Sequence, residues 1–482
     1  MSNWQHVDDH FIDGAWVTAL GDDRIEVVNP ATEEVWGSVP IATAHEVDQA
    51  MEAAKRAFTA GPWPRLSAAE RAESLVKFAY EVELRAAALS RTNTLENGSP
   101  VAETAGAASN AAGILRYFAS LAPHLDDEDI RAFPSGVGES VVRREPLGVC
   151  ALIAPWNFPI NLVVIKLAPA LLAGNTVVIK PASPTPLSIR HIVEAAAAAG
   201  IPAGVINLIT GNGRTGDAMV RHPLVDKVAF TGSTEVGRRI AAVCGELLRP
   251  VTLELGGKSA AILLDDVDLD AFAQVFVRSC MRNSGQTCYI STRILAPRSR
   301  YEEIVSTISE TVASAQQGDP FDPGTVFGPV ANRSQYESVL EHLASARDEG
   351  ARFVTGGTTR AGTGFFIEPT VLADVTPQMR VAREEIFGPV VTIQPYESVE
   401  EAIALSNSTQ FGLGGIVFSA DEERAFAVAE ELDSGSVGIN FFASNHAAPF
   451  GGRHDSGMGV EYGREGLEQY INFKSIHRSV PD

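Results

Sequence analysis

The stretch NTVVIKPASPTPLSIRHIVEAAAAAGIPAGVINLIT, residues 175–210, decides the fold class of this chain. It begins with the β-branched run NTVVIKP and ends with a similar run, GVINLIT, which both predict strands. The alanine-rich segment LSIRHIVEAAAAAG between them predicts a helix. A strand, a helix and a second strand in this order are typical of parallel strands joined by a crossover helix. We therefore expect an α/β protein.

The same alternation continues on both sides of this unit. Strands are predicted at GVCALIAP (148–155), DKVAFTG (226–232) and SAAILLD (259–265), and a helix at EVGRRIAAVCGELL (235–248). A second series follows Cys288 and runs from SVLEHLASARDEG through FFIEPTVLADV and FGPVVTIQPY to SVGINF. The chain has 482 residues, well past the roughly 250–300 at which a single core stops growing. We therefore expect two or three domains, including a second α/β domain.

Composition and charge narrow the possible partners. Lysine and arginine number 38 and aspartate and glutamate 60, so the net charge of −22 would repel nucleic acid and anionic membrane surfaces. The start MSNWQHVDDH lacks the basic residues and the apolar run of a secretory signal. The apolar stretch PINLVVIKLAPALLAG is interrupted by Lys166 before it reaches membrane-spanning length. We expect a cytoplasmic protein without nucleic-acid or membrane partners.

Four cysteines are present, namely Cys150, Cys244, Cys280 and Cys288. They are too few for a disulfide scaffold, and no two of them have the two-residue spacing typical of zinc ligands, so we expect neither disulfides nor a metal. Cys288 stands apart because it lies in the polar, glycine-containing loop NSGQTCYIST after the predicted helix AFAQVFVRSCMR. Exposure and polar neighbours favour the thiolate. The alternative is an inert thiol.

Two other residues could carry chemistry. Glu254 stands inside the apolar run VTLELGGKSA, just before Gly256 and Gly257, and burial raises the pKa of a carboxyl toward the range of a general base. The alternative is a structural acid whose hydrogen bonds are satisfied. Asn157 lies between two prolines in PWNFP, where a fixed side-chain amide could donate to a developing oxyanion. The alternative is an ordinary turn asparagine.

Two glycine-containing turns could hold a dinucleotide. FTGSTEVG (230–237) follows a strand and opens a helix, so Gly232 and Ser233 would let a pyrophosphate approach the helix N-terminus. GNGRTG (211–216) matches the dinucleotide fingerprint letter for letter, but no acidic residue ends a second strand at the expected offset. The second turn could instead line the adenosine side, and either could need its glycines only for backbone geometry. Lys180, which ends the strand NTVVIK, could face a ligand there or lie on the surface.

Seven motifs occur together in the order of one family: PWNFP, VIKPAS, FTGSTEVG, LELGGKSA, GQTCYIST, EEIFGPV and PFGG. From about residue 10 to its C-terminus the chain resembles the aldehyde dehydrogenase superfamily, in its NAD(P)-dependent, non-acylating branch. The resemblance implies a Rossmann-type cofactor domain (1–123 and 147–256), an α/β catalytic domain (257–455) and a small β oligomerisation arm (124–146 and 470–482). It also implies a homo-oligomer, either a dimer or a tetramer.

The resemblance further implies that an aldehyde is oxidised to a carboxylic acid through a thiohemiacetal and a thioester on Cys288. Asn157 and the Cys288 amide would form an oxyanion hole, Lys166 would support Asn157 and Glu461, and Glu254 would be the general base. Thiolate attack on the aldehyde gives an oxyanion, its collapse expels a hydride to a nicotinamide, and water then hydrolyses the thioester.

NAD is the cofactor that the resemblance implies. Lys180 would bind the adenosine ribose, Ser233 the pyrophosphate, and Glu385 the nicotinamide ribose, with Phe387 beside the nicotinamide ring. Ser183 stands where many NAD-preferring relatives carry a glutamate that repels a 2′-phosphate, so NADP could be tolerated. The complete cofactor set is Ile153, Pro155, Trp156, Lys180, Ser183, Gly213, Phe230, Gly232, Ser233, Val236, Leu255, Glu385 and Phe387.

The substrate pocket that the resemblance implies is mostly apolar and has no obvious carboxylate-binding arginine. We therefore expect an aliphatic, aromatic or terpenoid aldehyde as the substrate, rather than an acidic semialdehyde. Arg453, His454 and Val460 depart from the family pattern; the first two could change the polarity of the pocket or of an interface. The expected pocket residues are Phe158, Leu162, Ile165, Tyr289 and Phe450.

Three other functions fit parts of the sequence. An aldehyde dehydrogenase that passes the acyl group to CoA would usually lack Glu254. A cysteine hydrolase would need a histidine base, and none of the ten histidines sits in a recognisable motif. A catalytically silent binding or structural relative would not need to keep Cys288, Glu254 and Asn157 together.

Overall fold

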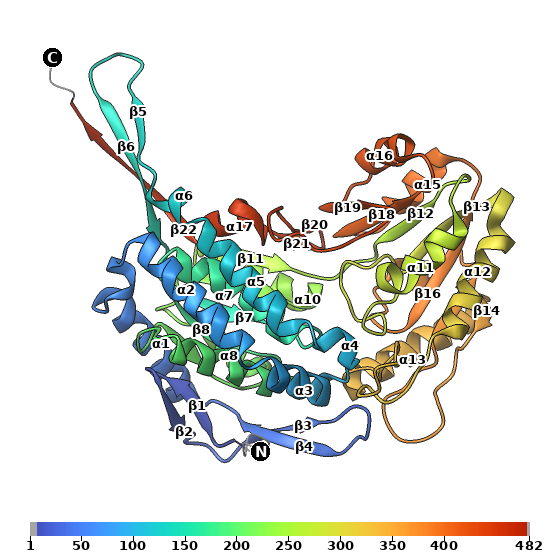
Figure 1. Cartoon of the computed structure of the whole chain (residues 1–482), viewed down its shortest axis with the longest axis horizontal. Coiled ribbons are helices and arrows are strands. Elements are labelled where there is room, and N and C mark those ends of the chain that lie inside the picture. Colours follow the sequence, from blue (N-terminus) through green and yellow to red (C-terminus); the bar gives the residue numbers. More distant parts are fainter. Residues whose placement is uncertain (1–6, 480–482) are drawn as a thin grey trace.

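An eight-stranded sheet lies in the left-hand lobe of the computed structural model, which describes residues 7–479 (Figure 1). Its strand order is β2-β1-β9-β8-β7-β10-β11-β21, and the run from β9 to β11 is parallel. The strands predicted in the first series up to DKVAFTG are confirmed as β7 to β10. The bounds are β1 Asp9–Ile12, β2 Ala15–Thr18, β7 Val149–Ile153, β8 Thr176–Lys180, β9 Ile206–Leu208, β10 Lys227–Thr231, β11 Val251–Glu254 and β21 Gly457–Met458.

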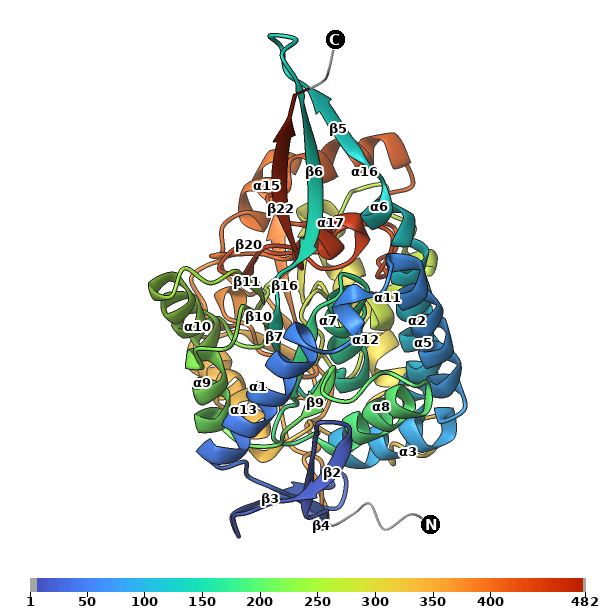
Figure 2. The same cartoon turned by 90° about the vertical axis from the view of Figure 1, so that its left-hand side faces the viewer.

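Helices cover both faces of this sheet because successive strand residues point to opposite sides. In β7, Cys150 and Leu152 pack into the core beneath α2, α5, α7 and α8, whereas Val149, Ala151 and Ile153 pack beneath α1, α9 and α10. Figure 2 shows these two groups of helices on either side of the strands. Their bounds are α1 Ala44–Thr59, α2 Ala68–Glu83, α5 Ala107–Ser120, α7 Pro159–Leu172, α8 Leu187–Ala198, α9 Gly213–Arg221 and α10 Thr234–Glu246. The expected α/β fold is confirmed.

A seven-stranded sheet forms the second lobe, in the order β14-β15-β16-β13-β12-β18-β19 (Figure 1). The predicted strand SAAILLD belongs to this sheet as β12, and the second α/β series is confirmed. The strands are β12 Ala260–Leu263, β13 Arg293–Pro297, β14 Arg352–Thr355, β15 Thr370–Ala373, β16 Val390–Tyr396, β18 Gly414–Phe418 and β19 Ser436–Ile439. The helices are α11 Leu269–Cys280, α12 Tyr301–Ser314, α13 Arg333–Asp348, α14 Arg380–Arg383, α15 Val399–Ser406 and α16 Glu422–Glu430.

A narrow three-stranded sheet projects from the first lobe and has the order β22-β6-β5 (Figures 1 and 2). Its strands are β5 Asp129–Ala132, β6 Glu139–Pro146 and β22 Ile471–Arg478. They fall within the two segments assigned to an oligomerisation arm, and that role stays a prediction. Residues 1–6, assigned to the cofactor domain, and 480–482, assigned to the arm, lie outside the described residues.

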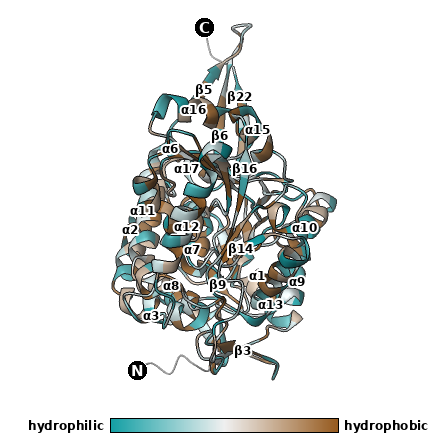
Figure 3. Ribbon diagram, turned by 90° about the vertical axis from the view of Figure 1, so that its right-hand side faces the viewer, coloured by the Kyte–Doolittle hydropathy of each residue, from teal (hydrophilic) through white to brown (hydrophobic). Residues whose placement is uncertain are grey.

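The hydropathy colouring shows brown residues concentrated on strands and inner helix faces, with teal on outer helices such as α3 and α10 (Figure 3). Among the helices of residues 7–479, none has both the length and the apolar composition needed to cross a membrane.

The remaining elements have the following bounds: β3 Arg24–Val28, β4 Val35–Pro40, α3 Ala86–Asn97, α4 Val101–Thr104, α6 Ala122–Asp126, β17 Phe411–Gly412, β20 Arg453–His454 and α17 Gly463–Glu468, with short 3-10 turns at Trp63–Arg65 and Arg298–Arg300.

The loop between α11 and β13 carries Cys288 and is held in an unusual backbone path. Asn283, Ser284 and Gly285 have φ values of 53°, 55° and 76°, a region that residues with a side chain rarely adopt. A Cβ atom on Gly285 would overlap the backbone carbonyl of Gly388. The loop therefore depends on a glycine at this point.

Replacing Gly285 by alanine should lower the free energy of unfolding by about 1–3 kcal/mol, because strain at a positive φ adds to the overlap with Gly388. Urea unfolding measures the loss. Gly245→Ala is the matched control, since Gly245 lies in α10 with open space around its Cα, and alanine there should be neutral or stabilising. Equal stability of the Gly285 variant and the native protein would contradict the argument.

Candidate active site

The candidate site lies where the strand order of the first sheet reverses. From β7 the chain proceeds to β8 and β9 on one side, whereas β10 and β11 lie on the other. Ligands of open α/β sheets bind at the carboxyl ends of the strands at such a switch point. Asn157 follows β7 and Gly232 follows β10, so both predicted residues stand at this point.

Two cavities meet at Cys288. One, the inner cavity, contains Glu254 and Glu461 in its wall; the other, the outer cavity, contains Glu385 and Phe387. Residues lining both are Asn157, Leu162, Thr231 and Cys288. A thiol at such a junction can contact one ligand from each side.

The surroundings of the Cys288 thiol favour its protonated form over the expected thiolate. The residue is partly exposed, whereas Cys150, Cys244 and Cys280 are buried. Desolvation raises the pKa of the Cys288 thiol well above its usual value, and the carboxyls of Glu385 and Glu254 raise it further. Burial and these acids, which are distant in sequence, therefore oppose the thiolate that the polar loop was expected to favour.

Glu254 ends β11 and is buried. Neither of its carboxyl oxygens has a hydrogen-bond partner among the described residues. Burial raises the pKa of Glu254 well above its usual value, Glu461 raises it further, and Lys166 opposes the shift. These surroundings favour the uncharged carboxyl, and the side chain becomes available as a base as the pH rises.

A buried ion pair lies behind Glu254. The Nζ atom of Lys166, in α7, lies 2.7 Å from Oε1 of Glu461 and donates to Oγ1 of Thr231 at 2.5 Å. The predicted contact with Glu461 is present, but the hydrogen bonds of Lys166 within residues 7–479 go to Glu461 and Thr231, not to Asn157. The expected support of Asn157 is thus corrected. Sequence reasoning missed Thr231, although it stands inside the FTGSTEVG motif.

Asn157 is held by the Cys288 loop instead. Its Nδ2 donates to the carbonyl of Gln286 at 3.0 Å, leaving its second amide hydrogen for a ligand. Its own backbone carbonyl accepts from Nδ2 of Asn97 at 3.3 Å and Nδ2 of Asn283 at 3.2 Å. Asn97, at the end of α3, carried no sequence signal, because its role depends on a contact 60 residues along the chain.

The outer cavity contains part of the predicted cofactor set. Oε1 of Glu385 accepts from the Gly257 amide at 3.1 Å, and burial raises the pKa of Glu385 to about 7. A Cβ on Gly256 would lie 2.5 Å from Oε2 of Glu385, so glycine permits this approach. The rings of Phe387 and Trp156 are 5.3 Å apart, edge to face. Cofactor-set residues that line this cavity are Pro155, Trp156, Gly232, Ser233, Leu255, Glu385 and Phe387.

The start of α10 presents Ser233 beside the outer cavity. Ser233 caps α10, accepting from the Val236 amide at 3.4 Å. Phe230, in β10, is buried against Gly232, which has no room for a side chain there. Gly237 likewise allows α10 to approach Leu255. These contacts fix the helix N-terminus, where backbone amides favour an anion.

The other predicted cofactor residues lie around the ends of β7, β8 and α9, outside the cavity lining. Ile153 is the buried last residue of β7, and Gly213 is the first residue of α9. Ser183 donates to the Gly211 carbonyl at 3.2 Å. Nζ of Lys180 donates to the Pro181 carbonyl at 3.1 Å, and burial lowers the pKa of Lys180 to about 8. The GNGRTG turn therefore lies next to Ser183.

The inner cavity contains four of the five predicted pocket residues: Phe158, Leu162, Tyr289 and Phe450. Ile165 does not line it. The side chain of Ile165 is 1% exposed and packs in the core between α7 and its neighbours. Its assignment to the pocket is corrected, because its side chain is buried among the core residues of the first lobe.

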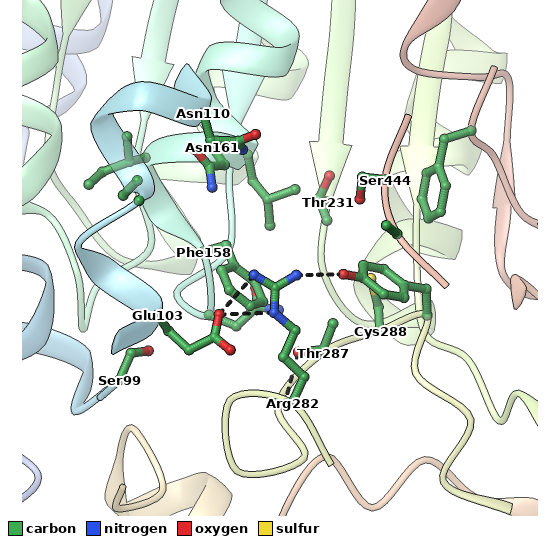
Figure 4. Close-up of a pocket in the computed structure, with 18 of the residues that line it drawn as sticks. Ser99, Glu103, Asn110, Phe158, Asn161, Thr231, Arg282, Thr287, Cys288 and Ser444 are labelled. Atoms are coloured by element: carbon green, nitrogen blue, oxygen red, sulfur yellow. Dashed lines mark hydrogen bonds and ion pairs between the residues drawn. The ribbon is translucent and has the colours of Figure 1, made fainter. Parts of the chain in front are cut away.

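The inner cavity also contains polar and charged side chains, which the expected, mostly apolar pocket set did not include. Arg282 lies in its wall together with Glu103, Asn110 and Asn161 (Figure 4). Arg278 lies there too, exposed to solvent. Arg282 was missed because it ends the predicted helix AFAQVFVRSCMR, and nothing in the loop that follows indicates that its side chain faces the cavity.

The departures from the family pattern near the C-terminus lie away from both cavities. Arg453 and His454 bind the two oxygens of Asp433 at 2.9 and 2.5 Å on the surface. Val460 lines neither cavity. Within residues 7–479, no group of three or more histidine, cysteine, aspartate or glutamate side chains is arranged to hold a metal ion.

Comparison with known proteins agrees with this arrangement. Residues 16–476 match the model of the aldehyde dehydrogenase family. The chain is 45% identical to geranial dehydrogenase of Castellaniella defragrans, over 98% of each chain. A Mycobacterium tuberculosis aldehyde dehydrogenase complexed with NAD+ superimposes with a TM-score of 0.96 at 42% identity, over 99% of each chain. A mutant aldehyde dehydrogenase C of Pseudomonas syringae, complexed with NAD+ and octanal, has a TM-score of 0.94 at 38% identity, over 97% of this chain and 96% of that one. This chain belongs to the aldehyde dehydrogenase family.

Proposed function

We propose that this protein oxidises an uncharged, largely apolar aldehyde to the carboxylic acid with NAD, through a thioester on Cys288. The observation that carries the proposal is the position of the Cys288 thiol at the meeting point of two cavities, with the buried carboxyl of Glu254 in the wall of one of them. A substrate on one side of the thiol and a cofactor on the other is the arrangement that such a reaction needs.

The substrate class is supported by the lining of the inner cavity and by the relatives. Phe158, Leu162, Phe442 and Phe450 supply apolar surface beside Cys288. One relative is named for geranial, a terpenoid aldehyde, and one structural neighbour holds octanal, an aliphatic one. An aliphatic or terpenoid aldehyde is therefore the proposed substrate.

The outer cavity fits NAD. Buried Glu385 could accept hydrogen bonds from ribose hydroxyls, Phe387 and Trp156 offer ring faces and edges, and the amides at the start of α10 favour a pyrophosphate. Structural neighbours complexed with NAD+ support the assignment. When bound, NAD accepts a hydride from the substrate carbon.

The chain's own residues supply the remaining chemistry. The thiolate of Cys288 attacks the carbonyl carbon, and the free amide hydrogen of Asn157 together with the Cys288 N–H holds the oxyanion. Ionised Glu254 takes a proton from the water that hydrolyses the thioester. Because neighbouring charges and burial raise the pKa of both Cys288 and Glu254, both steps are favoured as the pH rises above neutral.

The domain bounds and the oligomer are part of the same proposal. We propose a cofactor domain of 1–123 and 147–256, a catalytic domain of 257–455, and an arm of 124–146 and 470–482. Large apolar side chains are exposed on the projecting sheet, namely Ile130, Phe473 and Ile476. Such side chains on a projecting sheet support its burial against another copy of the chain.

Replacing Cys288 by alanine should abolish aldehyde-dependent formation of reduced nicotinamide while leaving cofactor binding nearly intact, because the thiol forms the covalent bond. Absorbance of the reduced nicotinamide across a panel of aldehydes tests the first part, and cofactor titration by fluorescence tests the second. Cys280→Ala is the control, since Cys280 is buried in the core of the second lobe and its loss should affect only packing. Turnover by the Cys288 variant above background would refute the proposal.

Replacing Glu254 by glutamine should allow thioester formation but slow its hydrolysis, since an amide cannot take a proton from water. The expected signal is a burst of reduced nicotinamide of about one per active site, followed by slow turnover. In the native enzyme the steady rate should increase with pH above neutral, and this increase should weaken in the variant. No burst despite normal cofactor binding would assign Glu254 an earlier role or none.

Replacing Ser183 by glutamate should penalise NADP selectively, because the native site has no carboxylate at 183 to repel a 2′-phosphate and Lys180 stands close along the chain. The expected shift in the ratio of the two kcat/KM values is about 1–3 kcal/mol. Ser183→Gln controls for size without charge. An equal effect of the glutamate on NAD and NADP would show that residue 183 does not face the ribose.

A further inference from the structure

An ion pair lies in the wall of the inner cavity and rests on residues that the chemistry above does not use. Nε and Nη2 of Arg282 both donate to Oε2 of Glu103, at 2.9 and 2.8 Å (Figure 4). Arg282 follows α11 and Glu103 lies in α4, so two distant segments meet across the cavity wall. Both side chains are 28% exposed, which places them at the cavity rather than in the core.

Other contacts fix the guanidinium of Arg282 in place. Its Nη1 donates to the hydroxyl of Tyr289 at 2.8 Å, and its Cζ atom lies 5.1 Å from the ring centre of Phe158. Tyr289 directly follows the reactive cysteine, and both aromatic residues line the cavity. The positive group is therefore positioned inside the substrate space, with donors left over on Nη1 and Nη2.

The other charged side chains in the wall of this cavity or behind it do not replace Arg282 as an anion site. Lys166 forms a buried pair with Glu461 and is occupied. Arg278 is exposed, where water screens its charge. The burial of Glu254 raises its pKa and favours its uncharged form. Arg282 is thus the partly buried cation that an anionic substrate would meet, and the carboxylate of Glu103 already balances it.

We propose that Glu103 determines which aldehydes this enzyme accepts, by neutralising Arg282 and so excluding aldehydes that carry a carboxylate. An incoming carboxylate would meet the negative charge of Glu103 and would have to displace it from a two-donor hydrogen bond, which is costly. A neutral aldehyde meets no such barrier. Without the charge of Glu103, the same guanidinium becomes a carboxylate-binding group. This inference rests on the proposed aldehyde oxidation.

The test compares linear ω-oxo carboxylates of several chain lengths with their methyl esters, which have nearly the same shape and no charge. The native enzyme should have a higher kcat/KM for the esters. Glu103→Gln should raise the ratio of acid to ester kcat/KM roughly tenfold or more for at least one chain length. Arg282→Gln in the Glu103→Gln background should remove that gain, because the gain comes from the guanidinium.

A matched control uses an arginine–glutamate pair outside the cavity. Glu83, in α2, binds Arg116 through two hydrogen bonds of 2.6 Å on the surface. Glu83→Gln changes the net charge equally and should leave the ratio of acid to ester unchanged. An increase in the Glu83 variant equal to that in the Glu103 variant would trace the effect to overall charge and overturn the inference.

The outcomes separate this inference from the proposed function. Failure of the native enzyme to oxidise any ester or neutral alkanal with NAD would overturn both. Oxidation of esters with an unchanged acid-to-ester ratio in a folded Glu103→Gln variant, checked by its melting temperature, would overturn this inference alone. If that variant does not fold, the native enzyme decides the question: equal kcat/KM for acids and esters would refute the neutralisation by Glu103.

Discussion

The buried ion pair between Lys166 and Glu461 is the interaction on which the site depends. Lys166 is fully buried in α7, and a charged group in such a position requires a partner, since an unpaired charge there costs several kcal/mol. Its partner comes from 295 residues further along the chain. The pair therefore holds the C-terminal segment against the first lobe. Because the backbones of Glu461 and Phe450 form a β-bridge, the pair also positions one wall of the inner cavity. The same carboxylate raises the pKa of Glu254.

The reactive loop is positioned by its backbone geometry and by hydrogen bonds to the turn that carries Asn157. Gly285 adopts a conformation that brings the loop against Gly388, and Asn157 reaches across to the carbonyl of Gln286. Asn283 returns a hydrogen bond to the backbone of Asn157. The loop that carries the thiol and the turn that carries the amide thus hold each other. This mutual restraint is the preorganisation that stabilising an oxyanion demands.

Charge balance determines the resting state of the site and its choice of ligand. Burial raises the pKa of the Cys288 thiol, and the carboxyls of Glu385, Glu254 and Glu461 raise it further, so the protonated thiol is favoured. This resting state protects the thiol, because the thiolate is the species that oxidants attack. In the wall of the inner cavity, Glu103 and Arg282 cancel each other. The negative net charge of the chain is therefore not reproduced inside the cavity.

The sequence alone was enough to predict the α/β class, the strands β7 to β10, the helices α8 and α10 and the family, because these depend on local periodicity and on motifs within a few residues. It also singled out Cys288 and Glu254, since a lone polar-loop cysteine and a carboxylate in an apolar strand are visible locally. Only the tertiary structure decided that Lys166 contacts Thr231 rather than Asn157, that Ile165 faces the core, and that Arg282 stands in the cavity paired with Glu103. Each of these depends on how a helix packs against other elements, or on contacts between residues that lie 65 and 179 positions apart. The protonated state of the thiol has the same origin, because burial and charge are properties of the folded surroundings and not of the loop.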